Sequence, residues 1–283
     1  MLRDVYPKAF ILNEVVAPYQ SGEVIVQSYN SLLSLAHLYR HADGLIIVEN
    51  DPVQQICAKR LGLKHVSFTH INKVISHQMS HFLAPATSTS GSRNFLGDFV
   101  QQLYAHPSYR LSSLLSIPMI ADANIQYSTF QWESTVKTLR QMLIAKAHME
   151  EGINWGMKVR PASDYNRSVA NALVLRGKGA ASVPIDSLNE GAMYPKWLPA
   201  NQRLQVYTNS RPFSGYEKSA SLLTNSQISI DTIDKLVLKA WNMFTSKAYV
   251  HQYEKHGLTS EDFLDCFTIL ESVICDYQRL SIT

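Results

Sequence analysis

The first 84 residues alternate between short apolar runs and stretches with helical spacing. Apolar runs occupy residues 9–16 and 44–48, and apolar side chains recur every three or four positions over 28–40 and 52–61. Apolar runs without strict alternation are typical of strands covered on both faces. A third short strand or turn is expected at 66–68. The succession of strands and helices predicts a parallel sheet with crossover helices.

A longer helical pattern follows and separates two halves of different character. Apolar residues at 71, 74, 75, 79, 82 and 83 share one helix face. Thr69 is the expected N-cap, and Ala84-Pro85 is the expected end of the helix. A Ser/Thr/Gly-rich loop comes next. We expect this central helix to pack against both halves of the chain.

The remaining pattern predicts a second α/β unit and then two long helices. Expected strands cover 111–117, 170–176, 204–208 and 219–224, and expected helices cover 99–105 and 129–146. Residues 150–166 are expected to form a long loop. Asp231 and Ser260 each begin a helix with an apolar stripe. The predicted fold class is therefore α/β, with a C-terminal helical hairpin.

Composition narrows the class of protein. The 283 residues are 46% hydrophobic and 17% charged, which is enough for a large core and suggests two domains. The formal net charge is +3 with both signs interspersed, so the sequence predicts neither a nucleic-acid partner nor a membrane partner. No apolar run reaches 18 residues, and no signal peptide is recognised, so a cytosolic or nuclear protein is expected.

Few residues match known reactive motifs. Cys57, Cys266 and Cys275 form no CxxC pair and are expected to be buried free thiols. His77 and His81 are four residues apart, but no third metal ligand is evident, so no metal site is predicted. Phosphate-binding glycine motifs and protease or kinase signatures do not occur in the sequence. Catalytic chemistry is not evident from these residues.

Polar residues near the ends of the predicted strands form the one candidate site. The loops at 17–27, 49–51 and 67–72 should meet at the carboxyl edge of the sheet, where ligands of such folds bind. They contribute five candidate residues: Glu23, Gln27, Asn50, Phe68 and Asn72. Phe68 and Asn72 are four residues apart and so lie near each other on the helix. The Phe68 ring could stack on a planar base while the Asn72 amide recognises the edge of that base. The alternative is a core Phe and a solvent-exposed Asn.

Several sequence segments resemble tubulins. They include 24–30 (VIVQSYN), 48–57 (VENDPVQQIC), 68–72 (FTHIN) and 244–253 (FTSKAYVHQY), and the resemblance extends over nearly all of the chain. It implies three parts: residues 1–84 as the C-terminal part of a GTP-binding domain that ends with the central helix, 85–228 as an intermediate α/β domain, and 229–283 as C-terminal helices. The phosphate-binding half of a tubulin would precede residue 1, so we expect a partial sequence.

The resemblance also implies roles for individual residues. Asn50 and Asn72 correspond to residues that bind the guanine edge of GTP, and Phe68 replaces a stacking Tyr. Glu23 and Gln27 correspond to ribose-facing acids, and Gln27 departs from the family by lacking a charge. Mg²⁺ would accompany GTP in a full-length protein.

One further acid has an implied catalytic role. Asp98, which follows Gly97 at the start of a predicted helix, resembles the acid that activates water at a neighbouring subunit's GTP. The alternative is an acid stabilised by the helix dipole. GTP hydrolysis would require the full-length polymerised protein, so this chain alone is expected to be inactive.

The resemblance implies a cytoskeletal protein that acts in centrioles and basal bodies, with other tubulins and centriolar proteins as partners. The alternative is a non-polymerising module that docks on a tubulin or a centriolar protein without binding nucleotide. The guanine-side residues favour the first function, whereas the missing phosphate motif favours the second for this chain alone.

Overall fold

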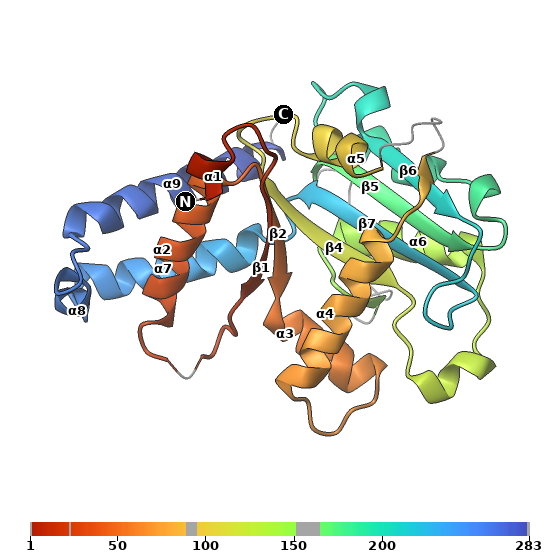
Figure 1. Cartoon of the computed structure of the whole chain (residues 1–283), viewed down its shortest axis with the longest axis horizontal. Coiled ribbons are helices and arrows are strands. Elements are labelled where there is room, and N and C mark those ends of the chain that lie inside the picture. Colours follow the sequence, from red (N-terminus) through yellow and green to blue (C-terminus); the bar gives the residue numbers. More distant parts are fainter. Residues whose placement is uncertain (1, 23, 89–94, 151–164, 282–283) are drawn as a thin grey trace.

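The computed structural model describes residues 2–22, 24–88, 95–150 and 165–281, which form helices around a mixed sheet (Figure 1). The sheet has seven strands in the order β1-β2-β4-β7-β5-β6-β3. The strands are β1 Leu12–Ala17, β2 Gly44–Glu49, β3 Thr87–Ser88, β4 Leu111–Ile117, β5 Ser168–Gly177, β6 Leu204–Asn209 and β7 Lys218–Ser226. The predicted α/β fold class is confirmed.

Strand pairing divides the sheet into a parallel part and a mixed part. β1 and β2 are parallel, with Val15 opposite Ile47, and β2 is parallel to the first two residues of β4. Beyond β4, the β4–β7 and β7–β5 pairs are antiparallel, and β5–β6 is parallel. No strand forms at 66–68, where Ser67 instead caps a helix.

Nine α-helices occur in the described part of the chain. They are α1 Leu2–Val5, α2 Gln27–His41, α3 Asn50–Gln55, α4 Phe68–Leu83, α5 Phe95–Leu103, α6 Trp132–Ala145, α7 Ile230–Thr245, α8 Val250–Glu254 and α9 Ser260–Arg279. A π-helical turn over Ile56–Arg60 continues α3. The expected long loop at 150–166 falls mostly outside the described residues.

Different helices cover the two faces of the central strands. Leu115 of β4 packs in one apolar cluster with Leu139 of α6. Its neighbour Leu114 points to the opposite face and packs in another cluster with Phe82 of α4 and Phe99 of α5. Because successive strand residues point to opposite faces, burial on both sides requires an apolar run without alternation. All seven residues of β4 are buried accordingly.

Helices α2, α7 and α9 lie together beside β1 and β2 (Figure 1). Leu32 of α2, Ile233 of α7 and Phe263 of α9 are buried in one cluster with Leu45 and Ile47 of β2. The predicted C-terminal helical hairpin is thus confirmed, with α8 in the connection. Its apolar stripes are covered by α2 as well as by each other.

The central helix α4 packs against both halves of the molecule, as predicted. It contacts α3 and the π-helical turn on one side, and β4 and β7 on the other. It begins two residues earlier than expected because Ser67, rather than Thr69, is the N-cap and exchanges capping hydrogen bonds with His70. Its C-cap is Ala84, as the Ala84-Pro85 pair predicted.

The end of α4 is held by buried polar side chains. The His81 imidazole is 2% exposed and lies 2.7 Å from the hydroxyls of both Ser219 and Ser221 on β7. Arg176 of β5 donates to the carbonyls of His81, Ala84 and Pro85. Both ring nitrogens of His81 thus have a serine hydroxyl as hydrogen-bond partner, and Arg176 satisfies the carbonyls at the end of the helix.

The cysteines differ from the prediction. Cys57 is buried, Cys266 is half-buried and Cys275 is exposed, and all three are free thiols. The prediction of a buried thiol is wrong for Cys275, because it lies on the outer side of α9.

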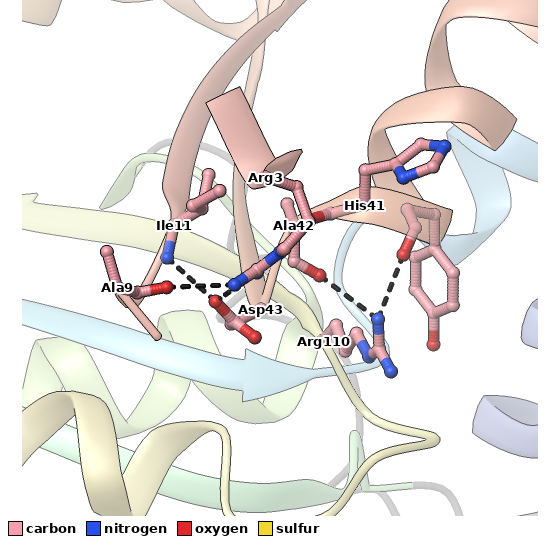
Figure 2. Close-up of polar contacts among 8 residues, drawn as sticks. Arg3, Ala9, Ile11, His41, Ala42, Asp43 and Arg110 are labelled. Carbon is pink, nitrogen blue, oxygen red and sulfur yellow. Dashed lines mark hydrogen bonds and ion pairs between the residues drawn. The ribbon is translucent and has the colours of Figure 1, made fainter. Parts of the chain in front are cut away.

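Polar contacts fasten the N-terminal segment to the end of α2 (Figure 2). The Asp43 carboxylate accepts hydrogen bonds from the Ile11 backbone N–H at 2.7 Å and from the Arg3 guanidinium at 2.6 Å. Arg3 also donates to the carbonyls of Ala9 and His41. Asp43 thereby fixes the point at which the chain enters β1.

Replacing Asp43 with alanine should lower the free energy of unfolding by about 1–2 kcal/mol, because it leaves the Ile11 N–H and the Arg3 guanidinium without their shared acceptor. Urea unfolding followed by circular dichroism measures this change. Asp234→Ala on the exposed side of α7 is the matched control, with an expected change within about 0.5 kcal/mol. Equal stability of the two variants would contradict the anchoring role.

Candidate functional site

A cavity of about 550 Å³ lies beyond the carboxyl ends of β1 and β2. Three of the five predicted base-side and ribose-side residues line it: Gln27, Asn50 and Phe68. Gln27 begins α2, Asn50 begins α3 and Phe68 begins α4. The crossover topology thus places the start of three successive helices around one opening, as expected at the edge of a parallel sheet.

Asn50 supplies a buried amide to this cavity. The residue is 9% exposed and follows Glu49, which ends β2 and is the N-cap of α3. Its side-chain amide has no hydrogen bond within the described part of the chain, although it lines the cavity. An amide carries both donors and an acceptor, so Asn50 can bind the edge of a planar heterocycle.

The Asp51 carboxylate does not cap α3, whose N-cap is Glu49. Asp51 lies within the first turn, and its carboxylate accepts a hydrogen bond from the Gln20 N–H at 2.9 Å. The carboxylate therefore fixes the loop after β1 rather than the start of α3.

Glu49 is held by side chains that do not line the cavity. Its carboxylate accepts a hydrogen bond from the Thr232 hydroxyl at 2.6 Å, and His148 Nε2 lies 3.4 Å away. Burial alone would raise the pKa of Glu49, but the neighbouring His148, Thr232 and Ser229 side chains hold it below its ordinary value. Glu49 is therefore an ionised anchor between β2 and α7.

Phe68 presents an open aromatic face. Its side chain is 65% exposed although it is large and apolar. A core role, the alternative considered from the sequence, would require burial. An exposed ring at the rim of a cavity is suited to stacking on a ligand.

Gln27 separates this cavity from the neighbouring space beside α7. Its Nε2 donates to the Tyr19 carbonyl at 2.6 Å. Its Oε1 lies against Gly22, where a Cβ would come within 1.6 Å of that oxygen. This close approach requires glycine at position 22 unless the Gln27 side chain moves.

The other two predicted residues do not join this set. Asn72 lies one turn after Phe68 on α4, is exposed, and is not among the residues that line the cavity. Glu23 is outside the described residues.

Sequence reasoning missed Tyr19. Its ring centroid lies 6.3 Å from that of Phe68, with the ring planes 53° apart. Tyr19 follows Pro18 in a polar loop without periodicity, so the sequence offered no signal that its ring would reach the start of α4.

Asp98 lies apart from these residues. It is half-buried on α5 and lines a second cavity of about 510 Å³ with Trp197, Gln102 and Gln205. One carboxylate oxygen, Oδ2, is buried without a hydrogen-bond partner in the described structure. Burial, together with the negative charge of Asp98, raises the pKa of Tyr207 on β6.

Metal-binding clusters and membrane-spanning helices are both absent from the residues that the structure describes. No group of three or more His, Cys, Asp or Glu side chains there could hold a metal ion. None of the described helices combines the length and the apolar character needed to cross a membrane.

Comparisons with known proteins identify the family of the chain. The family model described as "Tubulin/FtsZ family, GTPase domain" matches residues 1–58. The chain belongs to the tubulin family.

Within this family, the chain resembles delta chains. It is 43% identical over 298 residues to the tubulin delta chain of Canis lupus familiaris and 43% identical over 296 residues to that of Homo sapiens. Each match covers 99% of this chain but 65% of the relative. The tubulin alpha-6 chain of Naegleria pringsheimi is 24% identical over 292 residues, covering 98% of this chain and 61% of that one.

Proposed function

We propose that this chain forms the guanine-side part of a GTP-binding cytoskeletal protein similar to delta-tubulin. The observation that carries the proposal is the cavity in which the unpaired Asn50 amide and the open Phe68 ring meet. The same family is shown by the comparisons. In this reading, residues 1–84 complete a GTP-binding domain, 85–228 form an intermediate domain, and 229–283 form the C-terminal helices.

The residues present suit the base and ribose of GTP. Asn50 would bind the guanine edge, Phe68 would stack on the base, and Gln27 would accept a hydrogen bond from a ribose hydroxyl through Oε1. Glu23 is proposed for the ribose, and Asn72 for the base once its side chain turns inward. GTP would supply the transferable phosphoryl group, and Mg²⁺ would accompany the phosphates in a full-length protein.

Asp98 is proposed to orient a water molecule toward the GTP of a neighbouring subunit. It lies in a cavity separate from the base-side cavity, which suits action on a second subunit's nucleotide. Because Oδ2 is buried, Oδ1 is the oxygen left to act on water. The proposed partners are therefore other tubulins, together with centriolar proteins, at the cytoskeleton of centrioles and basal bodies.

Asn50→Ala should weaken binding of guanosine 5′-monophosphate (GMP) about fivefold to tenfold, because it removes the amide that reads the base edge. Saturation-transfer NMR of the isolated chain at millimolar GMP measures this. Binding of GTP should be weaker than micromolar, because the sequence contains no phosphate-binding glycine motif.

Two controls test the selectivity. Adenosine 5′-monophosphate (AMP) should bind more weakly than GMP to the unmodified chain. The variant Gln55→Ala should leave GMP binding unchanged, because Gln55 is exposed on α3 and does not line the cavity. Equal binding of GMP, AMP and ribose 5-phosphate would overturn the proposal. That result would favour the alternative of an interaction module that does not use nucleotide.

A further inference from the structure

Tyr19 and Phe68 form two adjoining aromatic walls of the base-side cavity. Their centroids are 6.3 Å apart and their planes are tilted by 53°. A base held between two parallel rings needs about 7 Å between them, or two contacts of about 3.5 Å. The two rings therefore cannot enclose a base as a sandwich. They can contact it side by side, one on its face and the other near its edge.

Three side chains from different helices hold the backbone that carries Tyr19. Gln27 of α2 donates to the Tyr19 carbonyl at 2.6 Å. Asp51 of α3 accepts from the Gln20 N–H at 2.9 Å, and Lys239 of α7 donates to the Gln20 carbonyl at 2.6 Å. The Tyr19 carbonyl, the Gln20 N–H and the Gln20 carbonyl are thus each hydrogen-bonded to a side chain from a helix.

These three hydrogen bonds limit where the Tyr19 ring can lie. Loops are usually mobile because few contacts hold their backbone. Here Asp51 and Lys239 bind opposite ends of the Gln20 residue, and both bonds involve an ionised group, which makes them stronger than neutral ones. The ring is half-buried and packs partly against the cluster that contains Ile56 and Cys57. It is therefore presented to the cavity in a defined position.

We propose that Tyr19 is a second base-contacting residue of this site and that Asp51 and Lys239 are the positioning residues that present it. This inference rests on the proposed function, because it assumes a planar purine base in the cavity. It makes α7 part of the binding site, although no residue of α7 lines the base-side cavity itself.

Tyr19→Leu is expected to weaken GMP binding about fivefold to tenfold, because it removes one aromatic contact with the base. Tyr19→Phe should bind GMP within about twofold of the unmodified chain, since the ring face is kept. Ribose 5-phosphate, which lacks a base, should bind all three proteins equally. NMR titration of each protein gives the dissociation constants.

Lys239→Met should weaken GMP binding about threefold, and Lys239→Arg should restore it, because the guanidinium can also donate to the Gln20 carbonyl. The matched control is Lys235→Met, one turn earlier on the same exposed side of α7, which should leave GMP binding unchanged. Urea unfolding should show the same stability for both methionine variants. A purely structural effect of Lys239 would instead lower stability without rescue of binding by arginine.

The possible results separate this inference from the proposed function. If Phe68→Leu weakens GMP binding and Tyr19→Leu does not, the proposed function stands and the role of Tyr19 is wrong. If Tyr19→Phe is as weak as Tyr19→Leu, stacking by Tyr19 is also wrong. If the unmodified chain does not prefer GMP to ribose 5-phosphate, both proposals fail together.

Discussion

Arg176→Leu is expected to lower the free energy of unfolding by about 2–4 kcal/mol. Arg176 is 3% exposed on β5 and donates to the carbonyls of His81 at 2.8 Å and Pro85 at 3.2 Å, as well as to that of Ala84. The first of these carbonyls belongs to the last turn of α4, and the other two follow that turn directly. Without Arg176, the carbonyls of His81 and Ala84 lose their side-chain donor, whereas that of Pro85 keeps a hydrogen bond from Asn209. A buried carbonyl without a donor costs about 1–3 kcal/mol, although relaxation recovers part of this.

The charge of Arg176 adds to these hydrogen bonds. A cation near the C-terminal end of a helix interacts favourably with the helix dipole. Arg176→Lys should recover only part of the loss, because one ammonium group cannot reach three carbonyls that a planar guanidinium spans. The stability of Arg176→Lys should therefore lie between those of the unmodified chain and Arg176→Leu.

Urea unfolding monitored by circular dichroism measures the three stabilities. Arg211→Leu is the matched control, because Arg211 is exposed and its side chain makes no hydrogen bond or ion pair in the described structure. That variant should change stability by no more than about 0.5 kcal/mol. A loss below about 1 kcal/mol for Arg176→Leu would show that α4 is fastened mainly by its apolar face.

The fold could be predicted from the sequence where one periodicity dominated a long segment. The stripe from Ile71 to Phe82 predicted α4, and the apolar run at 111–117 predicted β4 to the residue. The order of strands could not be predicted, because β7 inserts between β4 and β5 through contacts distant in sequence. The start of α4 was displaced by two residues because Ser67 and Thr69 competed as the N-cap.

Buried polar residues were the hardest feature to foresee. Arg176 ends an apolar run that predicted a strand, yet nothing local shows that its partners are the carbonyls at the end of α4. The same limit applies to the candidate site. Asn50 and Phe68 were predicted because they follow strand ends, whereas Tyr19 depends on Lys239, which is 220 residues away in sequence.

Acid should destabilise the protein through His81, by up to about 1.4 kcal/mol per pH unit below pH 6.5. Burial, with Arg176 and then His77 as further positive groups, lowers the pKa of His81 from 6.5 to about 3. The serine hydroxyls of β7 satisfy the neutral ring, since one ring nitrogen donates and the other accepts. The folded protein therefore excludes a proton that the unfolded chain binds.

The sign follows from this difference in proton binding. Between pH 6.5 and pH 3 the unfolded chain holds more protons at His81, so the free energy of unfolding falls as the pH falls. The stabilising contribution is complete above pH 6.5 and is lost progressively toward pH 3. His77 contributes in the same direction, because burial and then Lys73 lower its pKa, and Asp122 opposes them.

Urea unfolding at pH 7 and pH 5 tests this for the unmodified chain and for His81→Gln, whose amide can also donate to one hydroxyl and accept from the other. Between these pH values the unmodified chain should lose about 2 kcal/mol more than the variant, which has no titrating group at this position. His77→Gln is the control and should reduce the pH dependence less, because His77 is only half-buried. If the glutamine variant at position 81 does not fold, the His81 ring signals in NMR of the unmodified chain decide instead. They should stay those of a neutral imidazole at pH 5, whereas a midpoint near 6.5 would show that the ring accepts a proton within the fold.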